Sequence, residues 1–261
     1  SQNNGLVANR AMVVSAREEA SEIGAEIMKK GGNAFDAMVG IEMALAVSFP
    51  YAGNISGGGF MVYRKNTGET GALDYREKAP LQSSKDMYLD ASGNVIANLS
   101  TDGALAVGVP GTIAGMFAVH ERFGKLSIEE IMKPVIELAR KGVVVTAKQL
   151  KQINDNKADI IKVSGNETIY STNLKVGDTI KYPALAETLF RIMKIGKDEF
   201  YKGETAKKIV SFLSEKGGII SMEDLANYEA KWRTPITFNY KELTIISMSP
   251  PSSGGMTLQQ I

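Results

Sequence analysis

The stretch from Ser56 to Pro80 constrains the fold more than any other part of this sequence, because it is typical of a glycine run that leads into a β-hairpin. Gly57–Gly59 allow backbone conformations closed to other residues, and an apolar run follows at Phe60–Tyr63. Lys65–Gly68 supplies Asn and Gly for a chain reversal, and Gly71–Arg76 alternates like a returning strand. The pattern predicts a hairpin whose second strand ends in a loop.

Two charged residues lie at the end of this hairpin. Asp74 and Arg76 are two positions apart, so their side chains share one face of a strand. An arginine at a strand end beside a glycine-rich loop can bind a carboxylate through two parallel hydrogen bonds. The alternative is an internal ion pair with Asp74 or Glu77, which surface arginines commonly make. Spacing alone leaves these two interpretations of Arg76 even.

Composition narrows the classes of function. The 261 residues are 44% hydrophobic and 23% charged, which predicts a sizeable core in one globular domain over residues 1–261, or in two closely joined ones. A formal net charge of +1 argues against general attraction to nucleic acid or anionic membranes. The absence of cysteine excludes disulfides and thiolate catalysis. A single histidine, His120, cannot build a multi-histidine metal centre, so we expect a solvated or capping His120, no metal and no cofactor.

No signal peptide or membrane span is visible in this sequence. The first residues are polar, and the longest apolar segment is interrupted by Glu42 and ends at Pro50. A leader removed beforehand is compatible with this pattern.

Periodicity and capping signals predict most of the remaining elements. The segment Ala34–Phe49 carries only Asp36 and Glu42 as charges, which predicts a core helix. Further helices are expected over 16–30, 127–141, 183–194 and 204–216, after the turn at 108–112, and after Ser221. Strands are expected over 12–15, 231–240 and 242–248.

Several segments lack a regular period. We expect a loop with a short hairpin over Leu81–Thr101 and a mobile or variable surface segment over Lys151–Lys175. Gly108–Thr112 is interpreted as a tight turn rather than a phosphate site, because it lacks the motif of a phosphate-binding loop. A helix that starts near Met256 and stops at Ile261 suggests a chain that has been cut.

Common catalytic motifs are missing. The sequence holds no HExxH motif, no GxSxG motif and no metal-ligand cluster. Ser1 could use its own α-amino group as a base, yet it precedes a polar segment that is typical of a frayed end. No catalytic residue is therefore assigned, and Arg76 is the one candidate for substrate binding.

Several long blocks, taken in order, resemble the large subunit of γ-glutamyltranspeptidases. They are GGNAFDA (31–37), FPYAGNISGGGFMV (49–62), LDYREKAP (73–80), GVPGT (108–112), DEFYKG (198–203), EDLANYEAKWRTP (223–235) and PPSSGG (250–255). The resemblance extends from about Leu6 to the last residue and covers only the N-terminal portion of the large subunit.

The resemblance implies an α+β fold that forms part of the αββα four-layer sandwich of N-terminal nucleophile hydrolases. It also implies a precursor that cleaves itself, and a small subunit whose N-terminal threonine attacks γ-glutamyl amides such as glutathione. Within this chain, Arg76 matches the arginine that holds the glutamyl α-carboxylate. The implied location is periplasmic or secreted. A poly-γ-glutamate depolymerase, a cephalosporin acylase and a non-catalytic binding protein remain as alternatives.

Overall fold

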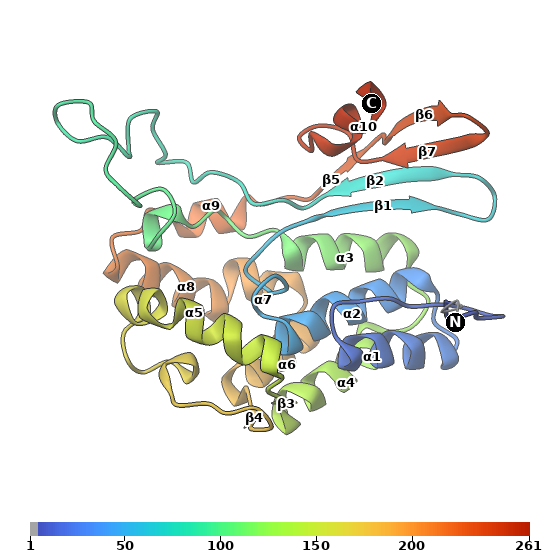
Figure 1. Cartoon of the computed structure of the whole chain (residues 1–261), viewed down its shortest axis with the longest axis horizontal. Coiled ribbons are helices and arrows are strands. Elements are labelled where there is room, and N and C mark those ends of the chain that lie inside the picture. The colour runs from blue at the N-terminus through green and yellow to red at the C-terminus, as the bar shows by residue number, and fades with distance from the viewer. Residues whose placement is uncertain (1–4) are drawn as a thin grey trace.

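The computed structural model describes residues 5–261, an α+β arrangement in which a small sheet lies over a layer of helices (Figure 1). The strands are β1 (Phe60–Arg64), β2 (Thr70–Asp74), β3 (Val143–Val144), β4 (Thr179–Ile180), β5 (Lys231–Arg233), β6 (Ile236–Tyr240) and β7 (Leu243–Ser247). The α-helices are α1 (Glu18–Lys29), α2 (Ala34–Ser48), α3 (Thr112–Phe123), α4 (Ile128–Lys141), α5 (Ala147–Ser164), α6 (Pro183–Ile195), α7 (Lys197–Lys202), α8 (Glu204–Glu215), α9 (Met222–Ala226) and α10 (Gly254–Gln260). Short 3₁₀ turns are η1 (Ala104–Ala106) and η2 (Ile169–Ser171).

The predicted hairpin forms the centre of the upper sheet. Its strands order as β1-β2-β5, all antiparallel, with Leu73 opposite Trp232 and Asp74 opposite Lys231. Met61, Leu73 and Tyr75 are buried against the helices beneath. Because successive side chains alternate, Asp74 and Lys231 lie on the opposite face, above the sheet.

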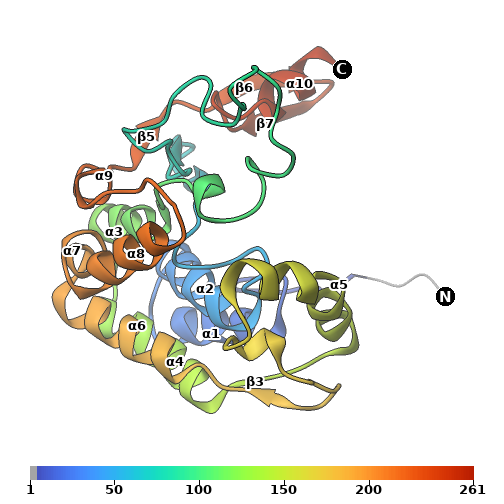
Figure 2. The same cartoon turned by 90° about the vertical axis from the view of Figure 1, so that its left-hand side faces the viewer.

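The core beneath the sheet is organised by α2, as its composition predicts. Val39, Met43 and Val47 on this helix are fully buried, and α2 packs against α1, α3 and α4. Asn33 caps its start by accepting hydrogen bonds from two backbone N–H groups, and the buried Asp36 completes the capping box. Figure 2, turned by 90°, shows α5 on the opposite side of α2 from α8.

The structure confirms most of the predicted elements. The helices at 18–29, 34–48, 128–141, 183–195 and 204–215, the capping boxes at Ser127 and Ser221, and the hairpin within 81–101 are all present. His120 is partly buried near the end of α3, with Nε2 2.8 Å from the carbonyl oxygen of Leu126, in keeping with a capping role. No helix within residues 5–261 is long and apolar enough to cross a membrane.

Three predicted elements are wrong. Met12–Ser15 is not a strand, because no neighbouring strand pairs with it among the described residues. The expected strand 231–240 is divided into β5 and β6, which join different sheets, since Pro235 lies between them and has no N–H to donate. The segment Lys151–Lys175 is mostly helix α5, whose start is capped by Thr146 and whose Ile153 packs in a small second core. Ser1 lies outside the described residues.

Candidate functional site

The glycine run lies directly against the loop that follows β2. Gly59 and Tyr75 exchange two backbone hydrogen bonds of 3.3 and 3.0 Å, which extend the β1–β2 ladder by one pair. A Cβ atom at Gly58 would come within 2.7 Å of the Tyr75 carbonyl oxygen and 2.8 Å of the Glu77 nitrogen. Only glycine therefore allows this close approach to the backbone on either side of Arg76.

The turn at Gly108–Thr112 holds this arrangement from the other side. The backbone N–H groups of Gly111 and Thr112 both donate to the Gly57 carbonyl, at 2.8 and 3.1 Å. Val109 and Lys78 form an antiparallel bridge through bonds of 3.1 and 2.7 Å. The N–H groups that could have received a phosphate are thus used internally, in agreement with the interpretation of this segment as a structural turn.

Asp74 at the end of β2 is paired with Arg233 of β5. Arg233 Nε and Nη2 lie 2.8 and 2.7 Å from Asp74 Oδ2, and the Asp74 side chain is only 11% exposed. The other oxygen, Oδ1, accepts a 3.1 Å hydrogen bond from the backbone N–H of Arg76. Both carboxylate oxygens of Asp74 are therefore engaged.

Arg76 is exposed, and its guanidinium forms no ion pair with any of the described residues. The predicted alternative, an ion pair with Asp74 or Glu77, is thus not present among the described residues: Asp74 is paired with Arg233, and Glu77 forms no ion pair with Arg76. Arg76 lines an open pocket of about 430 Å³. The other lining residues are Asp74, Glu77, Lys78, Lys231, Arg233 and Pro251.

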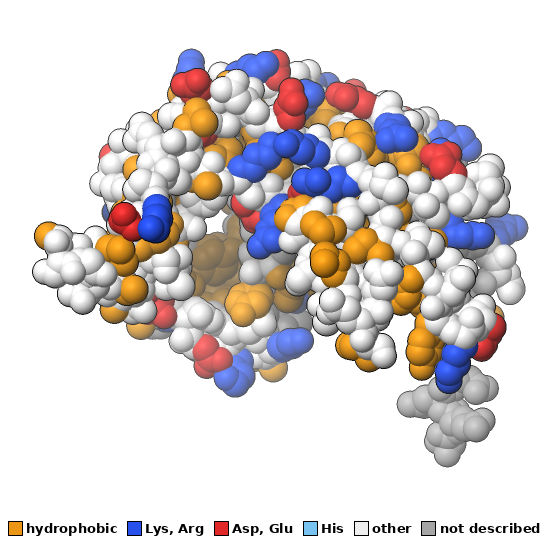
Figure 3. Space-filling model, turned by 90° about the horizontal axis from the view of Figure 1, so that it is seen from above, with side chains coloured by type: hydrophobic (Ala, Val, Ile, Leu, Met, Phe, Trp, Pro, Cys, Tyr) orange, Lys and Arg blue, Asp and Glu red, His pale blue; other side chains and the backbone are white. Residues whose placement is uncertain are grey.

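Positive charge dominates this pocket, which we call the Arg76 pocket. It has four cationic side chains against two carboxylates, and one of those carboxylates is neutralised by Arg233. Partial burial and the nearby Lys231 and Arg233 lower the pKa of Lys78, whose Nζ donates to the Glu229 carbonyl at 3.0 Å. Figure 3 looks onto this face, where Lys and Arg side chains gather near the middle beside a hollow. Such a pocket favours an anionic ligand.

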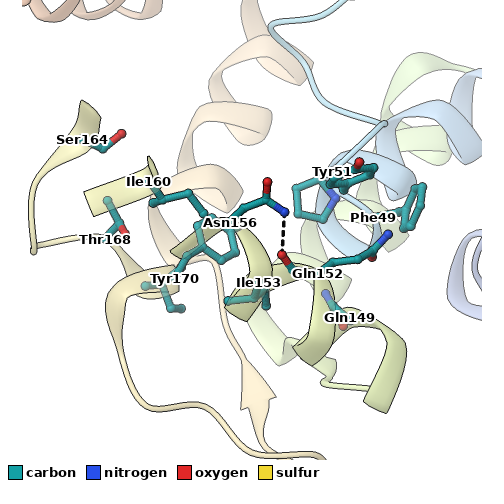
Figure 4. A pocket seen from close by; sticks show the side chains of 12 residues that line it. Phe49, Tyr51, Gln149, Gln152, Ile153, Asn156, Ile160, Ser164, Thr168 and Tyr170 are labelled. Carbon is teal, nitrogen blue, oxygen red and sulfur yellow. Dashed lines mark hydrogen bonds between the residues drawn. The ribbon is translucent and has the colours of Figure 1, made fainter. Parts of the chain in front are cut away.

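A second pocket lies between the loop after α2 and helix α5, and it is largely apolar (Figure 4). Its volume is about 520 Å³, and it is lined by Phe49, Pro50, Tyr51, Gln149, Gln152, Ile153, Asn156, Ile160, Ser164, Thr168, Ile169 and Tyr170. Its lining holds no charged side chain, and Asn156 donates to a backbone carbonyl of its own helix at 2.8 Å. The Arg76 pocket is therefore the better candidate for recognition of a charged substrate.

Sequence reasoning identified Arg76 but missed the residues around it. Lys231 and Arg233 belong to the expected strand 231–240, whose alternation already placed them on one face. The sequence does not indicate that this strand pairs with β2. That pairing brings Lys231 and Arg233 beside the end of β2, although the two strands are far apart in the sequence. Among residues 5–261, no group of three or more His, Cys, Asp or Glu side chains could hold a metal ion.

Comparisons with known proteins agree with this geometry. The family model described as gamma-glutamyltranspeptidase matches residues 20–261. A glutathione hydrolase proenzyme of Pseudomonas aeruginosa is 44% identical over 95% of this chain, and that of Escherichia coli K12 is 41% identical over 97%. The chain spans 44% of the length of each of these two relatives.

Comparison of the overall structure also indicates similarity to a gamma-glutamyltranspeptidase. The crystal structure of Helicobacter pylori gamma-glutamyltranspeptidase superposes with a TM-score of 0.95 and 42% identity, covering 98% of this chain and 75% of that one. The likeness therefore includes the hairpin, the helices beneath it and the loops that build the Arg76 pocket. Because the family model, the relatives and the fold agree over nearly the whole length, this chain belongs to the γ-glutamyltranspeptidase family.

Proposed function

We propose that this chain is the large-subunit portion of a γ-glutamyltranspeptidase, and that Arg76 binds the α-carboxylate of its γ-glutamyl substrate. The observation that carries the proposal is that the Arg76 side chain is exposed and unpaired among the described residues. Its guanidinium forms no ion pair with the described residues and faces an open, positively charged pocket, while the neighbouring Asp74 is already paired with Arg233. A planar guanidinium matches a carboxylate through two parallel hydrogen bonds, so this arrangement suits an amino-acid carboxylate.

The reaction is hydrolysis or transfer of the γ-glutamyl group from amides such as glutathione. The family resemblance implies that the nucleophile is the N-terminal threonine of a small subunit, released when a precursor cleaves itself. That threonine attacks the γ-carbonyl, the amine leaves, and water or an acceptor amine resolves the acyl-enzyme. The part proposed for this chain is to bind the glutamyl end and fix its orientation, so that the γ-carbonyl meets the nucleophile.

The first test is substitution of Arg76 in the complete enzyme. Arg76→Ala should raise the KM for a γ-glutamyl anilide roughly ten- to hundredfold, since a hydrogen bond to a charged group contributes about 1.5–3 kcal/mol. Arg76→Lys keeps the charge but loses the paired geometry, so it should recover only part of this loss. Self-cleavage of the precursor should continue in both variants. An unchanged KM in Arg76→Ala would refute the assignment of Arg76.

The second test concerns the location of the nucleophile. The isolated chain, incubated with a γ-glutamyl anilide, should release no aniline and form no acyl-enzyme detectable by mass spectrometry. Measurable turnover would contradict the proposal that the nucleophile belongs to another subunit.

The alternatives are less well supported. A poly-γ-glutamate depolymerase, a cephalosporin acylase and a non-catalytic binding protein are not favoured, because the relatives that match at 41–44% identity are glutathione hydrolases. A periplasmic or secreted location is part of the proposal. Cell fractionation tests it, and recovery of the activity in the cytoplasmic fraction alone would argue against it.

A further inference from the structure

The main chain of Arg76 is held by side chains rather than by the sheet. Arg76 lies two residues beyond the last residue of β2, and neither its N–H nor its carbonyl forms a backbone hydrogen bond with the described residues. Its N–H donates to Asp74 Oδ1 at 3.1 Å. Its carbonyl accepts a 2.8 Å hydrogen bond from the hydroxyl of Tyr228, which follows α9. Tyr228 thus fixes the side of Arg76 that Asp74 does not.

Tyr228 is itself rigidly placed. It is 7% exposed, and its ring stacks on that of Tyr201, with centroids 5.7 Å apart and an angle of 9° between the planes. The Tyr201 hydroxyl donates to the Pro110 carbonyl at 2.9 Å and accepts from the Ala114 N–H at 3.1 Å. The stack therefore connects Arg76 to helices α7 and α3 of the core.

The space around the Tyr228 hydroxyl is closely filled. A Cβ atom at Gly111 would collide with this hydroxyl and with the Tyr75 carbonyl, so only glycine fits there. On the other side, Lys78 Nζ lies 4.6 Å from the centroid of the Tyr228 ring. Burial is the main cause of a raised pKa at Tyr228, and the nearby carboxylates of Asp74 and Glu77 raise this pKa further. The phenol therefore stays protonated and can donate a hydrogen bond. Among the described residues, the one hydrogen bond that this hydroxyl donates is to the Arg76 carbonyl.

We infer that Tyr228 is a positioning residue for substrate binding, which holds the backbone of Arg76 so that its guanidinium meets the substrate carboxylate. This inference rests on the proposed function of Arg76 and adds a second residue to it. A rotation at the Arg76 carbonyl would move the origin of a long side chain, and an error of even a fraction of an ångström weakens a paired hydrogen bond. Tyr228 touches neither the substrate nor the reacting atoms in this assignment.

Tyr228→Phe in the complete enzyme tests the inference, because it removes one oxygen and keeps the ring stack. We expect the KM for a γ-glutamyl anilide to rise roughly three- to tenfold, the size of one net hydrogen bond, with kcat within about twofold of wild type. Tyr88→Phe is the matched control, since the Tyr88 hydroxyl also donates to a backbone carbonyl, that of Leu105, at 3.0 Å. Its KM should equal that of the wild type.

A double-mutant cycle separates positioning from a general structural effect. If Tyr228 acts through Arg76, Tyr228→Phe should change KM by less than about 1.5-fold in an Arg76→Ala background. The inference is overturned if Tyr228→Phe leaves KM unchanged, if its effect persists without the Arg76 side chain, or if kcat and the melting temperature fall together while KM does not move. A wild-type enzyme without γ-glutamyl activity, or Arg76→Ala with an unchanged KM, overturns the proposed function and this inference with it.

Discussion

Removal of Arg233 should affect both stability and substrate binding, because it leaves Asp74 without its partner. Asp74 is 11% exposed and Arg233 is 33% exposed, so the pair lies between a buried and a surface ion pair. Breaking a buried pair costs about 3–5 kcal/mol, whereas a surface pair contributes about 0–1 kcal/mol. For Arg233→Ala we therefore expect a loss of about 1–3 kcal/mol, since solvent reaches part of the arginine.

The same substitution should also weaken binding through Arg76. Once Asp74 loses Arg233, its carboxylate is free to attract the Arg76 guanidinium, since both residues line the same pocket, and Arg76 would then be less available to the substrate. Arg233→Ala should therefore raise the KM for a γ-glutamyl anilide. Adding Asp74→Asn removes the competing charge but keeps an oxygen that can accept from the Arg76 N–H, so the double variant should recover part of the lost affinity.

The assay combines thermal unfolding of the complete enzyme with steady-state kinetics. A loss of about 1–3 kcal/mol corresponds to a fall of roughly 1–3 °C in Tm, because the entropy of unfolding grows with chain length and relatives of the complete enzyme are more than twice as long as this chain. Arg140→Ala is the control, because Arg140 pairs with Glu187 at 3.1 Å where both side chains are more than half exposed. It should change the free energy of unfolding by less than about 1 kcal/mol, and Tm by less than about 1 °C. The reasoning is refuted if the two variants lose the same stability, or if Asp74→Asn worsens the KM of Arg233→Ala.

Three further substitutions test the core beneath the site. Arg191→Ala should cost about 3 kcal/mol in thermal or denaturant unfolding, because it leaves Glu199, 1% exposed and 2.8 Å from Arg191 Nε, as an unpaired buried charge. Ser127→Ala should cost about 1 kcal/mol in the same assay through loss of the α4 cap. Burial raises the pKa of Glu42 above 4.5, so its stabilising contribution is complete below that pH and is lost as pH rises. The Tm gain of Glu42→Gln should accordingly grow as the pH rises above 4.5, and a pH-independent difference would contradict this.

Elements defined by local signals could be predicted from the sequence. The capping boxes at Ser127 and Ser221 and the apolar surface of Ala34–Ser48 each depend on residues within a few positions, and the structure confirms them. Helix α5 was missed because its polar composition resembles a loop, and its only buried side chain, Ile153, gives a weak period. The division of 231–240 was missed because alternation continues across Pro235 while the sheet partner changes.

The site could be predicted only in part, for a related reason. Arg76 was found because its own neighbours, a glycine run and a strand end, carry the signal. The competing ion-pair interpretation could not be rejected from spacing, since Asp74 and Glu77 are equally near in the sequence. The structure decides against it through Arg233, whose distance from Asp74 along the chain is 159 residues. No local pattern specifies such a contact.

Both groups that fix the backbone of Arg76 depend on one distant segment. Tyr228 contacts its carbonyl from 152 residues away, and Arg233 orients Asp74, which accepts from its N–H. Such long-range contacts close large loops, and the packing of the helices between them offsets the entropic cost of closure. The segment that holds Tyr228 and Arg233 therefore connects the packed core to the backbone of Arg76. On this view the role of residues 228–233 is to hold the end of β2 in place, so the contribution of the chain to binding depends on them as well as on Arg76.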